Sequence, residues 1–184
     1  MPEKMSILKM NSRLTLQDLY CSGRPAPEGP TTKGKVLIIG YGNSLRGDDG
    51  VGLIAAERLL DLNLGEQTEV LVRQQLTPEL AEPISRANLV IFIDASVGAA
   101  AGTITSRSIA AATSPQSSLD HDCEAPVLLR YAKEFYGKTP EAVLLTVAGD
   151  CFDYGHELST AVSAAIPEIM KRVEELLLEV EQRR

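Results

Sequence analysis

One short stretch, VLIIGYGNSLRGDDGVG from Val36 to Gly52, constrains the fold of this chain more than any other. Four apolar residues come first, as in a strand that is covered on both faces of its sheet. A glycine-containing turn and two adjacent carboxylates, Asp48 and Asp49, follow, and a helical pattern begins at Gly50. The stretch therefore predicts a buried strand that delivers two acids to one edge of a sheet. Acids at such a place cost stability, which calls for a functional explanation.

Strand and helix patterns alternate along the rest of the chain. Further strands are predicted at 68–73, 89–93, 102–108 and 142–147, and helices near 50–62, 78–84, 125–136 and 166–180. This alternation is typical of a three-layer α/β/α sandwich around a mostly parallel, twisted sheet, here of about five strands. Ligands of such sheets bind beyond the carboxyl ends of the strands. We therefore expect the loops after Ile39, Ile93 and Val147 to share one rim.

Composition narrows the classes of function. The chain has 25 acidic and 18 basic side chains and a formal net charge of -7, which argues against a nucleic-acid groove. No apolar run approaches the roughly 20 residues that cross a bilayer, and the N-terminus shows no secretory signal. Cys21, Cys123 and Cys151 have no CxxC spacing, so we expect reduced thiols in a cytoplasm rather than a disulfide framework or a zinc knuckle.

The first 34 residues differ in composition from the rest. The segment 22–35 is rich in proline, glycine and charged residues, as linkers are. We therefore predict that residues 1–34 form a poorly ordered N-terminal extension that folding does not require. Residues 35–184 are predicted to form one α/β domain.

Three side chains could carry chemistry at the predicted rim. Asp49 and Asp94 each follow a predicted strand, and His121 lies in a polar loop just before a predicted helix. Two carboxylates and an imidazole form a ligand set for a divalent metal, and the same groups could do acid–base work. Each of these residues also has a simpler structural interpretation. Asp48 or Asp49 could cap the helix that begins at Gly50, an aspartate after a strand is often a turn residue, and a lone loop histidine usually lies at the surface.

Other chemistries find less support in the sequence. A dinucleotide fingerprint needs glycine at position 45, which is Leu45, and no Walker A loop is present. There is no GxSxG elbow and no HExxH motif, so serine and zincin mechanisms lose support. Cys123 and Cys151 could be nucleophiles, although small half-buried residues are the simpler interpretation.

The pattern as a whole resembles the hydrogenase maturation proteases, the endopeptidases that trim the large subunit of nickel–iron hydrogenases. The resemblance rests on GYGNSLRGDDGVG, on LVIFIDA with Asp94, on the loop of His121, and on LLTVAGDCFDYGHELS before the last helix. It extends over roughly 35–181. The chain departs from the family at Asp49, where many relatives have glutamate, and at His156, where glutamate is common.

The resemblance implies roles for individual residues. Asp49, Asp94 and His121 would bind a metal, and the two aspartates would also be the catalytic candidates. Asn43 and Asp48 match positions that shape the same loop or contact the substrate. The family has no metal cofactor of its own in this reading, because the three ligands sense nickel that the substrate already holds.

The resemblance also implies the reaction. The chain would be an endopeptidase, aspartic-type by family classification, that removes the C-terminal extension of a nickel–iron hydrogenase large subunit after nickel insertion. Its partner would be the nickel-loaded precursor, and the protein itself a cytoplasmic monomer. Whether water activated by a carboxylate, the metal or a side-chain nucleophile breaks the bond stays open. A non-catalytic, nickel-sensing chaperone of the same fold is the alternative.

Overall fold

The computed structural model describes residues 35–113 and 124–183, so the predictions for residues 1–34 and the position of His121 lie outside the described part of the chain. Within it, the strands are β1 (Val36–Tyr41), β2 (Thr68–Arg73), β3 (Leu89–Ser96), β4 (Ile104–Ser108) and β5 (Glu141–Ala148). The helices are α2 (Val51–Leu60), α3 (Ala81–Arg86), α4 (Ala125–Tyr136) and α5 (Thr160–Gln182), with 3-10 turns at Gly47–Gly50 and Pro78–Leu80.

The sheet is mostly parallel, as the sequence pattern predicts. Its strand order in the described residues is β2-β1-β3-β5-β4. The first four of these strands run parallel to their neighbours, and β4 pairs antiparallel with β5 at one edge. The carboxyl ends of β1, β3 and β5 therefore lie side by side, which confirms the predicted rim.

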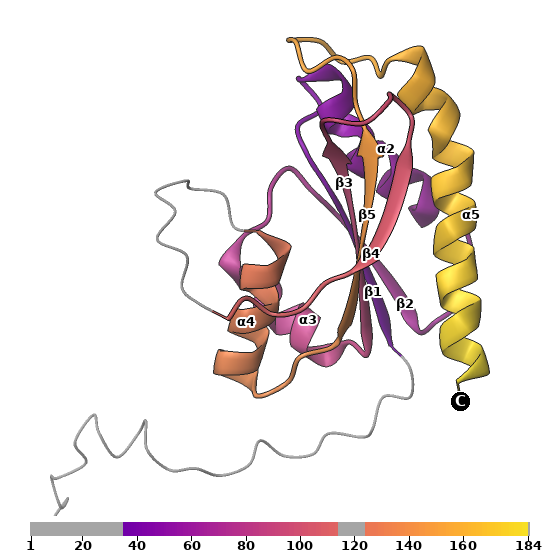
Figure 1. Cartoon of the computed structure of the whole chain (residues 1–184). Helices are drawn as coiled ribbons and strands as arrows, with labels where there is room; N and C mark the ends of the chain where they lie inside the picture. The colour runs from indigo at the N-terminus through magenta and orange to yellow at the C-terminus, as the bar shows by residue number, and fades with distance from the viewer. Residues whose placement is uncertain (1–34, 114–123, 184) are drawn as a thin grey trace, which may run out of the picture. The chain divides into compact units, whose positions relative to one another are not determined.

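Helices cover both faces of the sheet, so the predicted three-layer architecture is confirmed (Figure 1). Alternate residues of the strands divide between two hydrophobic clusters, as the two-residue period of a strand requires. Val36 and Ile38 of β1 pack with α2 and α5, whereas Leu37 and Ile39 pack with α3 and α4. Burial on both faces explains why these strands read as continuous apolar runs.

Several boundaries differ from the sequence prediction, and two of the differences bear on the site. Strand β3 continues through Asp94 to Ser96, because its backbone keeps pairing with β5 as far as Ala148. Asp94 is thus a strand residue opposite Thr146, not a turn residue after the strand. The predicted helix at Gly50 is preceded by a 3-10 turn that contains both adjacent aspartates.

Two glycines allow the first motif to pack directly against the sheet. Gly42 has a φ of 138°, which an L side chain rarely adopts, and a Cβ there would meet the carbonyl oxygen of Asp49. A Cβ on Gly52 would meet the carbonyl oxygens of Tyr41 and Ile93. The start of α2 can therefore lie directly against the ends of β1 and β3. None of the helices within the described residues is long and apolar enough to span a membrane.

Candidate functional site

A cleft of about 600 Å³ opens at the carboxyl ends of the strands. It is lined by the loops after β1 and β2, by Asp94 of β3, by Arg107 of β4 and by the first residues of α4. Asp94 and Arg107 lie on the same sheet face as Leu144, which belongs to the cluster beneath α3 and α4. The cleft therefore lies on the sheet face that α3 and α4 cover, at the carboxyl ends of the strands.

Asp49 and Asp94 both line this cleft, as the sequence predicts. The side chain of Asp49 is half-buried and accepts a hydrogen bond from the backbone N–H of Asn43 at 3.1 Å. Asn43 also lines the cleft, and its own side chain accepts from the backbone N–H of Leu45 at 2.9 Å. Asn43 thus closes the turn that carries the first motif, and Asp49 is held by the same turn.

Asp94 has an unusual electrostatic environment for a carboxylate. Burial, reinforced by the negative charge of Asp49, raises the pKa of Asp94 to about 6. The Tyr41 phenol and a hydrogen bond from the backbone N–H of Ala95 act against this rise without cancelling it. Burial and the charge of Asp94 also keep the pKa of the Tyr41 phenol well above its ordinary value, so that it stays protonated and can donate. A carboxylate with a pKa near 6 is suited to accept a proton from water at neutral pH.

Asp48 is adjacent to Asp49 in the sequence but does not line the cleft. It is fully buried, and its Oδ2 accepts from the backbone N–H groups of Asp150 at 2.8 Å and Cys151 at 3.0 Å. Its Oδ1 accepts from the N–H of Ser159 at 2.7 Å. Burial works to raise the pKa of Asp48, but these hydrogen bonds outweigh it and hold the pKa below its ordinary value. Neither Asp48 nor Asp49 caps α2, so the capping interpretation is wrong.

Backbone hydrogen bonds join the first motif to the loop that follows β5. The N–H of Gly47 donates to Gly155 at 2.9 Å, and the N–H of Gly155 donates to Leu45 at 2.9 Å. The N–H of Asp48 donates to the carbonyl of Cys151 at 2.8 Å. The first motif and the segment that follows β5 are therefore joined directly, with the Asp48 carboxylate between them.

The predicted third ligand cannot be placed. His121 lies outside the described residues, and within the described part of the chain no three histidine, cysteine or acidic side chains are arranged to hold a metal ion. The cleft does supply two carboxylates, which are hard oxygen donors suited to a divalent cation. His156 is exposed, and it is not among the residues that line the cleft.

Of the three cysteines, only Cys151 lies within the described residues. Cys151 is exposed rather than half-buried as expected, because its backbone and not its side chain faces Asp48. It does not line the cleft, which weakens the nucleophile interpretation for this residue. Cys21 and Cys123 lie outside the described residues.

Sequence reasoning missed several residues of the cleft. Among them, Tyr41, Arg107 and Glu124 line it together with the two acids. The two-residue period of a strand could have identified Tyr41, because it lies two residues beyond Ile39 and therefore points to the same face of the sheet. Arg107 carries no such signal, because only the pairing of β4 with β5 brings it to the cleft.

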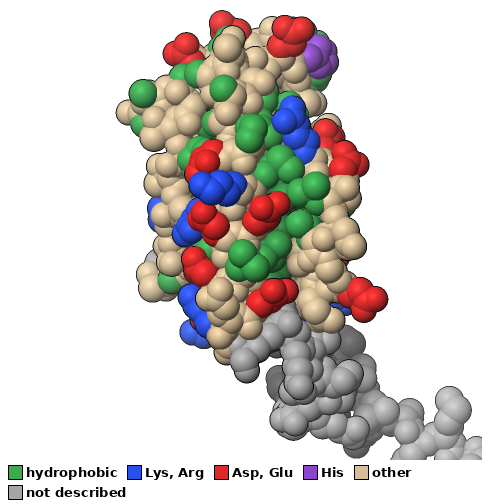
Figure 2. Space-filling model, turned by 90° about the vertical axis from the view of Figure 1, so that its right-hand side faces the viewer, with side chains coloured by type: hydrophobic (Ala, Val, Ile, Leu, Met, Phe, Trp, Pro, Cys, Tyr) green, Lys and Arg blue, Asp and Glu red, His purple; other side chains and the backbone are tan. Residues whose placement is uncertain are grey.

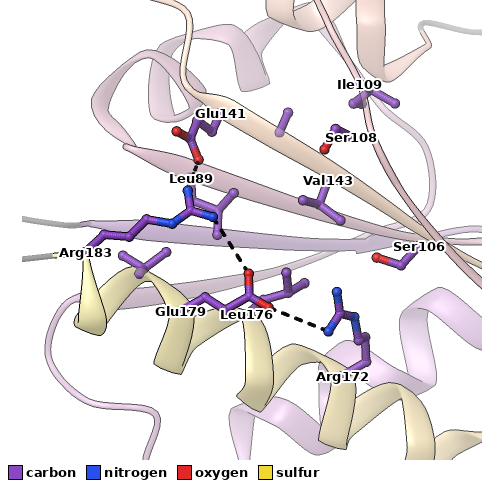
Figure 3. A pocket seen from close by; sticks show the side chains of 12 residues that line it. Leu89, Ser106, Ser108, Ile109, Glu141, Val143, Arg172, Leu176, Glu179 and Arg183 are labelled. Carbon is purple, nitrogen blue, oxygen red and sulfur yellow. Dashed lines mark hydrogen bonds and ion pairs between the residues drawn. The ribbon is translucent and has the colours of Figure 1, made fainter.

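A second cavity lies on the other face of the sheet. Figure 2 shows a band of hydrophobic side chains down the side of the molecule that carries α5, bordered by acidic and basic groups. There, a cavity of about 380 Å³ lies between α5 and the paired strands β4 and β5 (Figure 3). Its charged side chains pair with one another: Arg183 contacts Glu141 at 3.0 Å and Glu179 at 3.8 Å, and Arg172 contacts Glu179 at 3.8 Å. These pairs fasten the end of α5 to the sheet, so the cavity is a weaker candidate than the cleft.

Comparison with solved structures identifies proteins of the same fold. No protein-family model and no curated protein matches the sequence. The [NiFe] hydrogenase maturation protease HycI from Thermococcus kodakarensis is similar with a TM-score of 0.65 and 24% identity, over 79% of this chain and 93% of that one. A hydrogenase 2 maturation peptidase from a Thaumarchaeota archaeon has a TM-score of 0.61 and 25% identity, over 78% and 97%. The hydrogenase maturating endopeptidase HybD from E. coli has a TM-score of 0.60 and 22% identity, over 79% and 93%.

These similarities confirm the resemblance that the motifs predict. The chain has the fold of the [NiFe] hydrogenase maturation proteases, and it covers nearly the whole length of each of these relatives.

Proposed function

We propose that the chain is a peptidase of hydrogenase maturation that removes the C-terminal extension from the large subunit of a nickel–iron hydrogenase after nickel insertion. The observation that carries the proposal is the convergence of Asp49 and Asp94 on one cleft in a fold shared with such peptidases. The cleft is open at the rim, where an extended segment of a precursor can enter.

The nickel belongs to the precursor in this proposal. Asp49 and Asp94 offer carboxylate oxygens to a metal ion whose other ligands come from the substrate. His121, which precedes α4 in the sequence, is proposed as the third ligand because the first residues of α4 line the same cleft. Recognition then depends on the metal, because a precursor without nickel lacks the group that the carboxylates bind.

Asp94 is the better placed of the two acids for proton transfer. Its raised pKa of about 6 leaves it mostly ionised at pH 7, yet basic enough to take a proton from an attacking water. The neighbouring Asp49 acts to raise the pKa of Asp94, which adds to that basicity. This division gives Asp49 the role of metal ligand and Asp94 two alternative roles: metal ligand, or general base when no metal holds it, because coordination to a cation lowers the pKa of a carboxylate.

Incubation of the purified full-length protein with a precursor tests the proposal. Nickel-loaded precursor should lose its C-terminal extension, as seen by mass spectrometry, and nickel-free precursor should stay intact. Asp49→Asn and Asp94→Asn should each abolish the cut, while Asp61→Asn, at an exposed position at the end of α2, should not. Binding of the nickel-loaded precursor with no cut by the wild-type protein would favour the chaperone alternative.

A further inference from the structure

Tyr41 and Asp94 are neighbours across two parallel strands. The register of β1 and β3 pairs Gly40 with Ile93, so Tyr41 and Asp94 occupy the next position on each strand. Side chains at one register position of adjacent strands point to the same face. That face is the one beneath α3 and α4, and both side chains lie where the cleft begins.

The Tyr41 side chain combines an aromatic ring that packs against the core with a polar hydroxyl. It is half-buried and packs against the hydrophobic cluster that contains Ile39 and Phe92. Its hydroxyl end shares the cleft with the Asp94 carboxylate and lowers the pKa of that group. The Oδ1 atom of the same carboxylate accepts from the backbone N–H of Ala95 at 2.8 Å. One backbone donor and one anchored side-chain donor therefore act on this carboxylate.

We propose that Tyr41 is a positioning residue for Asp94, whose hydroxyl holds the carboxylate in the orientation that meets a divalent metal in the cleft. This inference rests on the proposed function, because orientation matters only if Asp94 contacts the metal. Hydrogen bonds to metal-binding carboxylates set their direction, and their loss costs about 10–100-fold in metal affinity or activity. A purely structural Tyr41 would contribute its ring and not its hydroxyl.

Three variants separate these two roles in the full-length protein. Tyr41→Phe removes only the hydroxyl, and Tyr41→Leu removes the hydroxyl and most of the ring. Tyr131→Phe makes the same chemical change on α4, outside the cleft lining. The measurements are the Kd for Ni²⁺ alone by titration calorimetry, kcat and KM for cut precursor, and Tm.

For Tyr41→Phe we expect the Kd for Ni²⁺ to rise about tenfold and kcat to fall by a similar factor. KM for the precursor should change less than about threefold, and Tm by only a few degrees, because the ring stays. Tyr41→Leu should lose the same metal affinity with a clear fall in Tm. Tyr131→Phe should match the wild type in all four quantities.

Other outcomes overturn the inference in distinguishable ways. If Tyr41→Phe matches the wild type in Kd and kcat while Tyr41→Leu does not, the ring alone matters and Tyr41 is structural. If Asp94→Asn binds Ni²⁺ as tightly as the wild type, the metal site itself is wrong, and the positioning role fails with it. Loss of binding in Asp94→Asn with no change in Tyr41→Phe leaves the proposed function standing and rejects only the role of Tyr41.

Discussion

The Asp48 carboxylate accepts a hydrogen bond at 2.7 Å from the backbone N–H of Ser159, a residue 111 positions further along the chain. Ser159 is also the N-cap of α5, since its hydroxyl accepts from the N–H of Val162. A single buried acid thus links the turn that carries Asp49 to the start of the longest described helix. Asp48 itself does not line the cleft, but it fixes the turn that places Asp49 there.

Asp48→Asn should therefore destabilise the protein strongly. An amide has one acceptor oxygen where the carboxylate has two, so its NH₂ group would face at least one backbone N–H in a buried site. We expect a loss on the order of 3 kcal/mol in the free energy of unfolding, measured by urea denaturation at pH 7. The exposed Asp153→Asn in the same loop is the control and should stay within about 0.5 kcal/mol. A tolerated Asp48→Asn would show that the three hydrogen bonds contribute little.

The pH dependence of this loss has a definite sign. The folded-state pKa of Asp48 lies below its ordinary value, so the ionised carboxylate stabilises the fold above pH 4 or so. That stabilisation disappears as the pH falls through the folded-state pKa. The difference in stability between wild type and Asp48→Asn should be constant from pH 5 to 8 and shrink in more acidic solution.

Asp94→Asn should have the opposite effect at neutral pH. The pKa of Asp94 is raised to about 6, so the folded state binds its proton more tightly than the unfolded state does. The ionised group thus costs stability above pH 6, and that cost fades as the pH falls toward 4. We expect Asp94→Asn to gain on the order of 1–2 kcal/mol at pH 7, after allowance for partial exposure, and to lose processing. Calorimetric Tm values at pH 4 and pH 7 would measure it, and a lower Tm at pH 7 would contradict it.

Local patterns in the sequence were enough to predict the fold. The apolar run at Val36 needs burial on both faces, and the alternation of strands and helices leaves few topologies open. The positions of Asp49 and Asp94 at one rim follow from connectivity alone. The role of Asp48 could not be predicted, because its three donors lie in a loop more than 100 residues away. The edge position of Arg107 depends on strand pairing, which no local pattern encodes.

Metal binding should weaken below about pH 6. A ligand must lose its proton to bind, Asp94 titrates in this range, and protonation removes an imidazole from a metal. We expect the Kd for Ni²⁺ to be nearly flat from pH 7 to 8 and to rise steeply below pH 6. In His121→Ala a dependence centred near pH 6 should persist because Asp94 remains. A flat Kd in His121→Ala from pH 5 to 8 would mean that Asp94 does not bind the metal.

The two histidines of the chain should differ sharply in importance. His156 is exposed in the loop after β5, packs edge-on against Tyr154 with ring centroids 6.5 Å apart, and does not line the cleft. His156→Ala should therefore leave Ni²⁺ affinity and precursor processing within about twofold of the wild type. His121→Ala should weaken Ni²⁺ binding by about 10-fold or more and slow processing to match, because an imidazole is a strong ligand for this metal. Titration calorimetry and a timed cleavage assay on the two variants give the comparison. The reverse result, with His156 essential and His121 dispensable, would move the third ligand to the loop after β5 and require that loop to close over the cleft.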